Sequence, residues 1–221
     1  MPIVRAVIFA AVMSAIVSSA RASDASASGF YIGLNAGVAG AAAEVTPVTA
    51  GSSSYTVGMG GGAAGALAGF LVETGPVALG IEAEVNGLDV SGDETTQVGG
   101  SRTRTEMELS RNARIRGRLG AGVGRRWFFY GAAGWTQVKT KMTLTSLSTP
   151  GQTSSASETL NGFSIGGGAE FAFNQRWVGR VEYVFDTYDG TTYKTGNGFF
   201  VNRRIDNLYM GTLRAAMSFK F

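Results

Sequence analysis

Polar and apolar side chains alternate over an unusually long stretch between Arg102 and Val123, and this leaves few architectures open to the chain. Every even position from Arg102 to Arg118 is polar, and from Met107 onward the odd positions are apolar or small except for Arg111. Side chains of a strand point alternately to opposite faces, so a period of two indicates a strand with two chemically different faces. The stretch also exceeds the roughly 3–10 residues of most strands in soluble domains.

The same period recurs along the chain, so we predict an all-β protein. It is clear in five further segments, at residues 30–38, 77–87, 163–173, 177–186 and 205–221. Two more segments, 60–73 and 127–138, are predicted strands whose faces the pattern does not resolve. In the second we favour an outward face made by Trp127, Phe129, Ala133 and Trp135.

The links between these eight predicted strands alternate in length. Short links fall at 73–76, 122–126 and 174–176, and long polar links at 41–59, 89–103, 143–157 and 188–202. In an up-and-down meander this order places every long loop at one end, which is typical of outer-membrane barrels. We therefore predict one domain, residues 23–221, folded as an eight-stranded antiparallel up-and-down transmembrane β-barrel.

Residues 1–22 have the composition of a cleaved secretory signal peptide. Arg5 gives a positive start, residues 6–17 are apolar, and Ala20-Arg21-Ala22 has the small-x-small form of a cleavage site. No later segment approaches the ~18 consecutive apolar residues of a transmembrane helix. An exported chain without such a helix is either a soluble β domain or a membrane β-barrel. The alternation of side chains alone does not distinguish these two classes.

The chain contains no His and no Cys, which excludes a Ser-His-Asp triad, a Cys nucleophile and the usual zinc and haem sites. We expect no catalytic, cofactor or metal site. Charged residues are only 16% of the chain, yet they gather on one strand face. Since the inside of an eight-stranded barrel just holds its side chains, these charges must pair there. The predicted interior set is Glu82, Glu84, Arg114, Arg116, Arg118, Glu170, Arg180, Glu182, Asp186, Arg214 and Lys220. It would form either an ionic plug or a narrow ion path gated by the Arg–Glu pairs.

Aromatic residues near the predicted strand ends favour the membrane barrel, because such barrels carry aromatic girdles at both interfaces. Near the short links these are Trp127, Phe128, Phe129, Phe171, Phe173, Trp177, Phe219 and Phe221. The segments GFYIGLNAGVAG (29–40) and LYMGTLRAAMSFKF (208–221) resemble the small porin-family proteins of the proteobacterial outer membrane, which share the barrel of the OmpA transmembrane domain. This resemblance implies an outer-membrane location. It also implies a C-terminal signal for the barrel-assembly machinery, carried by Leu213, Met217, Phe219 and Phe221.

Arg111 interrupts the predicted lipid-facing row. It lies about 12 residues from the short link, which at roughly 3.3 Å per residue and ~40° tilt is about 30 Å, above an apolar band of ~25 Å. We hypothesise that Arg111, Lys139 and Lys141 contact lipopolysaccharide phosphates; the alternative is that they are solvated cations above the membrane. The eight Arg between 102 and 126 do not indicate nucleic-acid binding, because six share one strand face and no aromatic platform lies among them.

We therefore expect a monomeric, non-enzymatic outer-membrane barrel with a structural or surface role. Envelope integrity and contacts made by the long loops would be its functions, and a narrow porin for passive diffusion of small solutes is a further option. The alternatives are a soluble, exported, lipocalin-like carrier and a loop-based adhesin with a host or surface ligand. A carrier would present its charged face to water and would remain soluble without detergent.

Overall fold

The computed structural model describes residues 28–48, 53–74, 77–98, 101–195 and 199–221, so the predicted signal peptide lies outside the described residues. The described chain is strand almost throughout. Its elements are β1 (Gly29–Pro47), β2 (Tyr55–Thr74), β3 (Val77–Val98), β4 (Ser101–Val123), β5 (Trp127–Ser146), β6 (Thr153–Ala172), β7 (Trp177–Tyr188), β8 (Thr191–Tyr193) and β9 (Arg203–Lys220).

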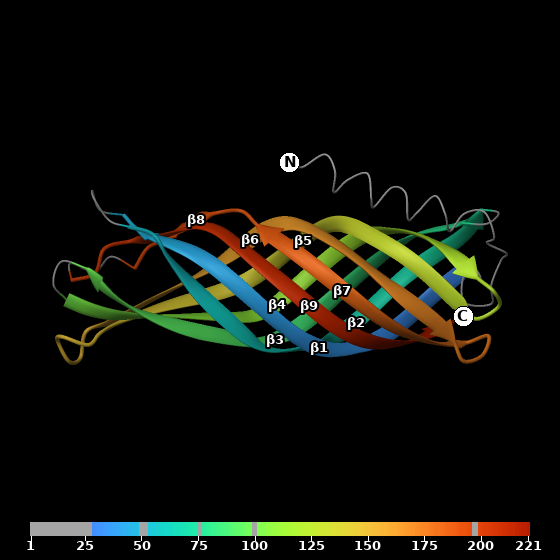
Figure 1. The fold of residues 1–221 in the computed structure, drawn as a ribbon, viewed down its shortest axis with the longest axis horizontal. Coiled ribbons are helices and arrows are strands. Elements are labelled where there is room, and N and C mark those ends of the chain that lie inside the picture. Colours follow the sequence, from blue (N-terminus) through green and yellow to red (C-terminus); the bar gives the residue numbers. More distant parts are fainter. Residues whose placement is uncertain (1–27, 49–52, 75–76, 99–100, 196–198) are drawn as a thin grey trace.

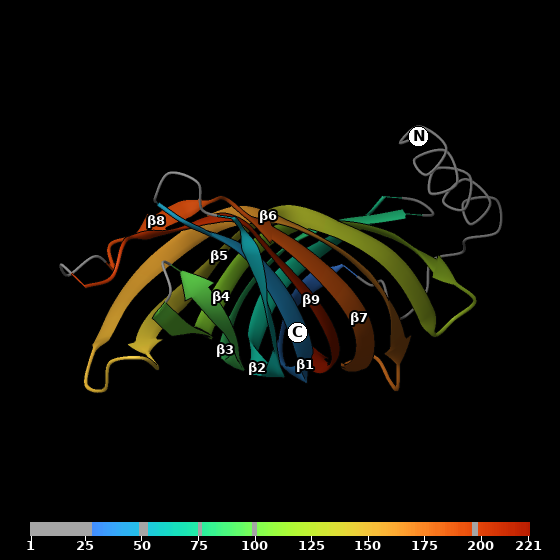
Figure 2. The same ribbon diagram turned by 60° about the vertical axis from the view of Figure 1, so that its left-hand side comes forward.

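Eight strands close into a ring, which confirms the predicted up-and-down barrel (Figure 1). Strands β1 to β7 pair with their neighbours in chain order, β7 pairs with β9, and β9 pairs with β1, all antiparallel. The three-residue β8 adds only to β9 and takes no part in the ring. Figure 1 shows it toward the end of the barrel opposite the C-terminus, and Figure 2 shows the same ribbon turned by 60°.

The two ends of the barrel differ as predicted. The tight links β4–β5 and β6–β7, together with the end of β2 and the start of β3, lie at the end that holds the C-terminus (Figure 1). In the β4–β5 link Gly124 has a φ of 65°, in the left-handed region that glycine reaches without strain. In the β6–β7 link the Asn174 side-chain oxygen accepts bonds from the amides of Arg176 and Trp177, each 2.9 Å long. We call this end the short-turn end, and the other the loop end.

The long links were predicted wrongly in extent, because most of their residues belong to strands. Residues 89–98 continue β3 and 101–103 begin β4, while β1 runs to Pro47 and β2 begins at Tyr55. Their Ser, Thr and Asp content resembles that of loops because many of these strand residues are exposed on the outer surface. At 22 and 23 residues, β3 and β4 reach roughly 55 Å along the axis, about twice the ~25 Å apolar band of an outer-membrane barrel.

A β-bulge in β4 changes the faces predicted for residues 102–110. Leu109 pairs with Thr140 but Arg111 pairs with Lys139, so Ser110 is the extra residue. One extra residue exchanges the two faces for all residues on the loop side of the bulge. Met107 and Leu109 therefore point inward, and both are fully buried. Arg102 and Arg104, which the alternation placed on the same face as Arg114, are exposed on the outer surface.

Strand β9 carries a second bulge with the same consequence. Glu44 of β1 pairs with Asn207, and the next residue, Val45, pairs with Ile205, which leaves Asp206 as the extra residue. Ile205, predicted to lie on the outward apolar face, is therefore buried inside, and Arg204 is exposed. Both bulges lie toward the loop end and turn apolar side chains inward there.

On the short-turn half of the barrel the apolar faces point outward. The face that we favoured for β5 is confirmed, since Trp127, Phe129 and Trp135 are all exposed. Phe128 was assigned wrongly to the aromatic girdle, because it is fully buried inside. Outward apolar residues exclude the lipocalin-like carrier, which would bury them. The other exposed members include Phe30, Ile32, Leu34, Ile81, Val85, Phe163, Ile165, Val181 and Leu213.

Candidate functional site

Strand pairing places acidic and basic side chains opposite each other inside the barrel. Four directly opposed pairs have opposite charge: Glu82 with Arg116, Glu84 with Arg114, Glu170 with Arg180, and Glu182 with Arg214. Cross-strand pairs of opposite charge stabilise a sheet. All of these side chains are at least nine-tenths buried.

Arg116 lies at the centre of the resulting set of ion pairs. Its guanidinium is 2.9 Å from Glu82, 3.2 Å from Glu84 and 2.8 Å from Glu182. Arg214 bonds two of the same carboxylates, at 2.6 Å to Glu84 and 2.5 Å to Glu182. One guanidinium from β4 and one from β9 thus hold three carboxylates from β3 and β7.

The set extends toward both ends of the barrel. Toward the loop end, Arg114 pairs with Glu84 and with Asp186, the latter at 2.5 Å. Toward the short-turn end, Arg118 and Arg180 both contact Glu170, at 2.6 and 2.7 Å. The sequence-predicted residues that these pairs bring together are Glu82, Glu84, Arg114, Arg116, Arg118, Glu170, Arg180, Glu182, Asp186 and Arg214, which we call the ionic core. Five carboxylates and five guanidinium groups leave it with no net charge. Lys220 is also buried, beside its short-turn end.

Two tyrosines line the short-turn end of the ionic core. Tyr31 donates a 2.9 Å hydrogen bond to Glu82 and accepts one of 2.7 Å from Arg118. The Arg118 guanidinium also lies 3.9 Å from the centre of the Tyr130 ring, within cation–π range. Gly69 makes room for the Tyr31 hydroxyl, since a Cβ there would lie 2.3 Å from it. Gly69 of β2 therefore leaves room for an interior side chain.

A layer of neutral polar side chains lies on the loop side of the ionic core. Asn112 donates hydrogen bonds to Thr136 at 2.9 Å and to Tyr188 at 3.0 Å. Asn86 donates to Asn112 at 3.2 Å and to Glu84 at 3.1 Å, which links this layer to the charges. Sequence reasoning did not single out this layer; its only signal is that Asn86 and Asn112 lie in phase with the charged residues.

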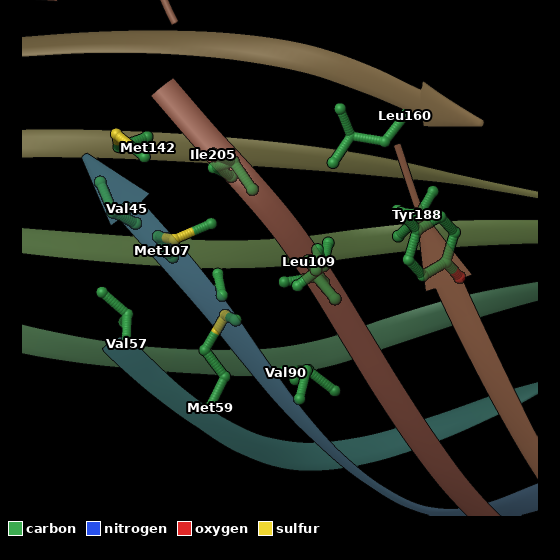
Figure 3. Close-up of a cluster of buried hydrophobic side chains, with 14 of the residues drawn as sticks. Val45, Val57, Met59, Val90, Met107, Leu109, Met142, Leu160, Tyr188 and Ile205 are labelled. Atoms are coloured by element: carbon green, nitrogen blue, oxygen red, sulfur yellow. The ribbon is translucent and has the colours of Figure 1, made fainter. Parts of the chain in front are cut away.

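Beyond this layer the interior becomes apolar. Side chains from strands all around the ring point toward one another there (Figure 3). This cluster, the apolar core, contains Ala39, Ala41, Ala43, Val45, Val57, Met59, Val90, Met107, Leu109, Val138, Met142, Leu144, Leu160, Tyr188, Tyr193, Phe200, Ile205, Leu208 and Met210. It was missed because the polar face was assumed to point inward along whole strands. A smaller apolar cluster that includes Leu71 and Phe128 lies near the short-turn end.

The three cations predicted to contact lipopolysaccharide all lie exposed on the outer surface. Arg111 and Lys139 are directly opposed on β4 and β5. Lys141 instead lies 3.7 Å from Glu108. A shallow hollow of about 580 Å³ adjoins the first two cations, and Val85, Gly87, Ala113, Gln137 and Thr159 also line it.

The C-terminal residues singled out from the sequence form an outward row on β9. Leu213, Met217 and Phe221 are exposed, and Phe219 packs edge-on against both Trp177 and Phe221. The Phe221 amide donates a 3.0 Å bond to the Phe30 carbonyl, which secures the last residue to β1.

A closed eight-stranded ring with apolar side chains outside and charges inside defines a barrel of the outer-membrane type. Within the described residues there is no helix whose length and hydropathy would suffice to span a bilayer. Residues 8–207 match the family model described as the outer membrane protein β-barrel domain. The chain therefore belongs to this family, and its location is the outer membrane.

The chain is also similar to individual proteins and solved structures. The 31 kDa outer-membrane immunogenic protein of Brucella melitensis is 26% identical over 207 residues, which cover 87% of this chain and 83% of that protein. The protein of the same name in Brucella suis matches equally. Among solved structures, the outer membrane protein OprG of Pseudomonas aeruginosa has a TM-score of 0.52 at 9% identity, covering 90% of this chain and all of that one. Neisserial surface protein A has a TM-score of 0.44 at 12% identity, and the match covers 87% of this chain and 97% of that one.

Proposed function

We propose that this protein is a closed, non-enzymatic barrel that holds its loop end as a rigid projection above the outer membrane. The single observation that carries the proposal is the reversal of side-chain burial along the barrel axis. The short-turn half has apolar residues outside and the ionic core inside. The loop half has the apolar core inside and polar residues outside, as in a water-soluble protein.

The outer surface of the loop half suits water rather than lipid. Its exposed residues include Asp89, Ser91, Asp93 and Thr95 on β3, Arg102, Arg104 and Glu108 on β4, and Ser155, Ser157 and Thr159 on β6. A charge on the lipid face costs free energy that rises toward the middle of the bilayer. The membrane therefore surrounds the short-turn half, and the loop half projects. The connections at its tip would make any contact with another surface.

Filling of the interior argues against the narrow porin. A solute crossing the barrel would have to pass the apolar core, the Asn112 layer and the ionic core in series. The ionic core has matched charges, and moving one partner would leave an unpaired buried charge, which is costly. A surface role in envelope integrity or loop-mediated contact therefore accounts for the interior better than passive diffusion does.

The absence of Cys from the sequence allows a clean test of the projection. Single substitutions Ser91→Cys and Ser155→Cys should react with a membrane-impermeant maleimide on intact cells, because both positions are exposed on the loop half. Ile81→Cys, exposed on the short-turn half, should stay unlabelled because lipid covers it. Met107→Cys is the matched interior control and should also stay unlabelled. The proposal would be overturned if Ile81→Cys reacted with the maleimide and Ser91→Cys did not.

Closure is tested separately in planar bilayers. The purified wild-type barrel should give no discrete conductance steps, because side chains fill its interior. Steady conductance from folded wild-type protein would instead support the porin. Folding of each sample is checked by comparing boiled and unboiled mobility in SDS.

A further inference from the structure

Two like charges face each other on the outer surface without a compensating carboxylate. Arg111 and Lys139 are cross-strand partners, and both are exposed. Like charges directly opposite each other destabilise a sheet. Across the part of the chain that the structure describes, neither forms an ion pair, whereas the nearby Lys141 lies 3.7 Å from Glu108 and Arg104 lies 3.0 Å from Asp93. The Arg111–Lys139 pair therefore attracts an anion that the protein itself does not supply.

The bulge in β4 aims Arg111 at this position. Ser110 is the extra residue, and both Ser110 and Arg111 are exposed although they are adjacent. In a regular strand one of the two would point into the barrel. Bulges are known to re-aim side chains in this way. The arrangement of the two cations thus depends on a local feature of the backbone.

The surface around the pair is hollowed. Arg111 and Lys139 adjoin a hollow of about 580 Å³, which Val85 and the small residues Gly87 and Ala113 help to line. Binding sites for small ligands commonly measure about 300–1,000 Å³. Gln137 also lines the hollow. Its side chain provides a neutral polar group beside the two charges.

The hollow lies at the height of lipid headgroups. Val123 and Trp127 flank the short turn between β4 and β5, and Arg111 and Lys139 each lie 12 residues from it along their strands. Twelve residues of a tilted strand rise by about 30 Å along the barrel axis, which places both cations just above the ~25 Å apolar band. Below the cations, the outward residues Ile115 and Trp135 are exposed and apolar, as acyl chains require.

We propose that Arg111 and Lys139 bind a phosphate group of one outer-leaflet lipid of the lipopolysaccharide type, whose acyl chains pack on the apolar surface below. Lys141, which the sequence hypothesis included, does not belong to this site because Glu108 neutralises it. The site rests on the outer-membrane location and not on the closed interior, so a conducting barrel would leave it intact.

The test measures binding to the folded barrel in neutral detergent. The probes are lipid A carrying its phosphates, the same lipid after dephosphorylation, and inorganic phosphate. The variant Arg111→Gln/Lys139→Gln should weaken phosphorylated lipid A binding by roughly tenfold. The control Lys141→Gln, which removes one charge from the same surface, should change it by less than about twofold. Binding should also weaken as salt is raised, since exposed charges are screened.

Each outcome has a defined meaning. Weak binding of dephosphorylated lipid A to wild type supports a phosphate site on a lipid. Competition by millimolar inorganic phosphate as strong as that by lipid A would overturn the lipid as the ligand. Equal binding by wild type and the double variant, with both shown to be folded by SDS mobility, would overturn the site itself. A loss in Lys141→Gln as large as in the double variant would do the same.

Discussion

Arg116 shows how much a single interior residue can carry in this barrel. Its side chain is fully buried and lies within ion-pair distance of three carboxylates, Glu82, Glu84 and Glu182. Of these, Glu82 also pairs with Arg118 and Arg180, and the other two also pair with Arg214. Because each acid has a second cation, removing Arg116 weakens the set without dissolving it.

We expect Arg116→Met to destabilise the folded barrel by about 3–5 kcal/mol, the cost of breaking a buried ion pair. Arg116→Lys should lie between this variant and wild type, since it keeps the charge but loses the planar fork that reaches several acids. The measurement is the urea midpoint of unfolding in lipid vesicles. Arg125→Met, in the exposed β4–β5 turn, is the control and should shift the free energy of unfolding by less than about 0.5 kcal/mol. Equal effects at Arg116 and Arg125 would show that the ionic core contributes little stability.

At the scale of the element, the bulge in β4 decides which residues of its loop half point inward and which are exposed. The period of two identified the strand correctly, but a period carries no signal for one extra residue. Ser110 and Arg111 are both polar, so the even-numbered pattern continued through the bulge unbroken. The sequence did contain a hint, because Arg111 was the one charge in the apolar row. A residue that violates the alternation marks the point where its phase changes.

Deleting Ser110 should remove the bulge and keep the faces of β4. Arg111 and Leu109 then become adjacent and still pair with adjacent residues of β5, so Leu109 still points inward. We expect this variant to pass the SDS mobility test of folding and to keep its loop half resistant to added protease. Deleting Ile115, in the regular part of β4, should instead turn Arg114 outward and fail the SDS mobility test, because a shift of one residue exchanges the two faces. Equal behaviour of the two deletions would contradict the assignment of Ser110 as the extra residue.

The bulge in β9 should make its end of the β1–β9 pair sensitive to acid. A 2.5 Å hydrogen bond from Thr46 and an ion pair with Arg204 hold the pKa of Asp206 below its ordinary value. Since the folded-state pKa is lowered, this contact stabilises the pair above the unfolded pKa of ~3.9 and is lost as the pH falls through the folded value. The protection factors of the Val45 and Ile205 amides, which remove the pH dependence of intrinsic exchange, should therefore fall in wild type as the pH drops below about 4. Asp206→Asn should abolish this step and Thr46→Val should reduce it, because the ion pair with Arg204 remains in the second variant. A step of wild-type size in both variants would contradict the assignment.

For the whole molecule, strand number, ring closure and the outward apolar face of the short-turn half could be predicted, because all three follow from alternation and link order. The apolar core inside the loop end could not. On β5, Trp135 and Lys139 lie on the same outward face, so the change from apolar to charged outward residues can be read from the sequence. The inward residues of the loop half cannot, because a period of two carries no signal for the extra residues in β4 and β9.

The stacked interior predicts how the barrel would open. Met107→Ala/Met142→Ala should cost about 2–5 kcal/mol per residue through lost packing. It should still give no conductance, because the ionic core lies beneath the apolar core in series. Arg114→Ala alone should be equally silent, because the apolar core then remains intact. The three substitutions combined with Asn112→Ala, which thins the polar layer between the two cores, should give the first conductance steps in planar bilayers, measured on protein that passes the SDS mobility test. Conductance in either partial variant would mean that one layer alone closes the barrel.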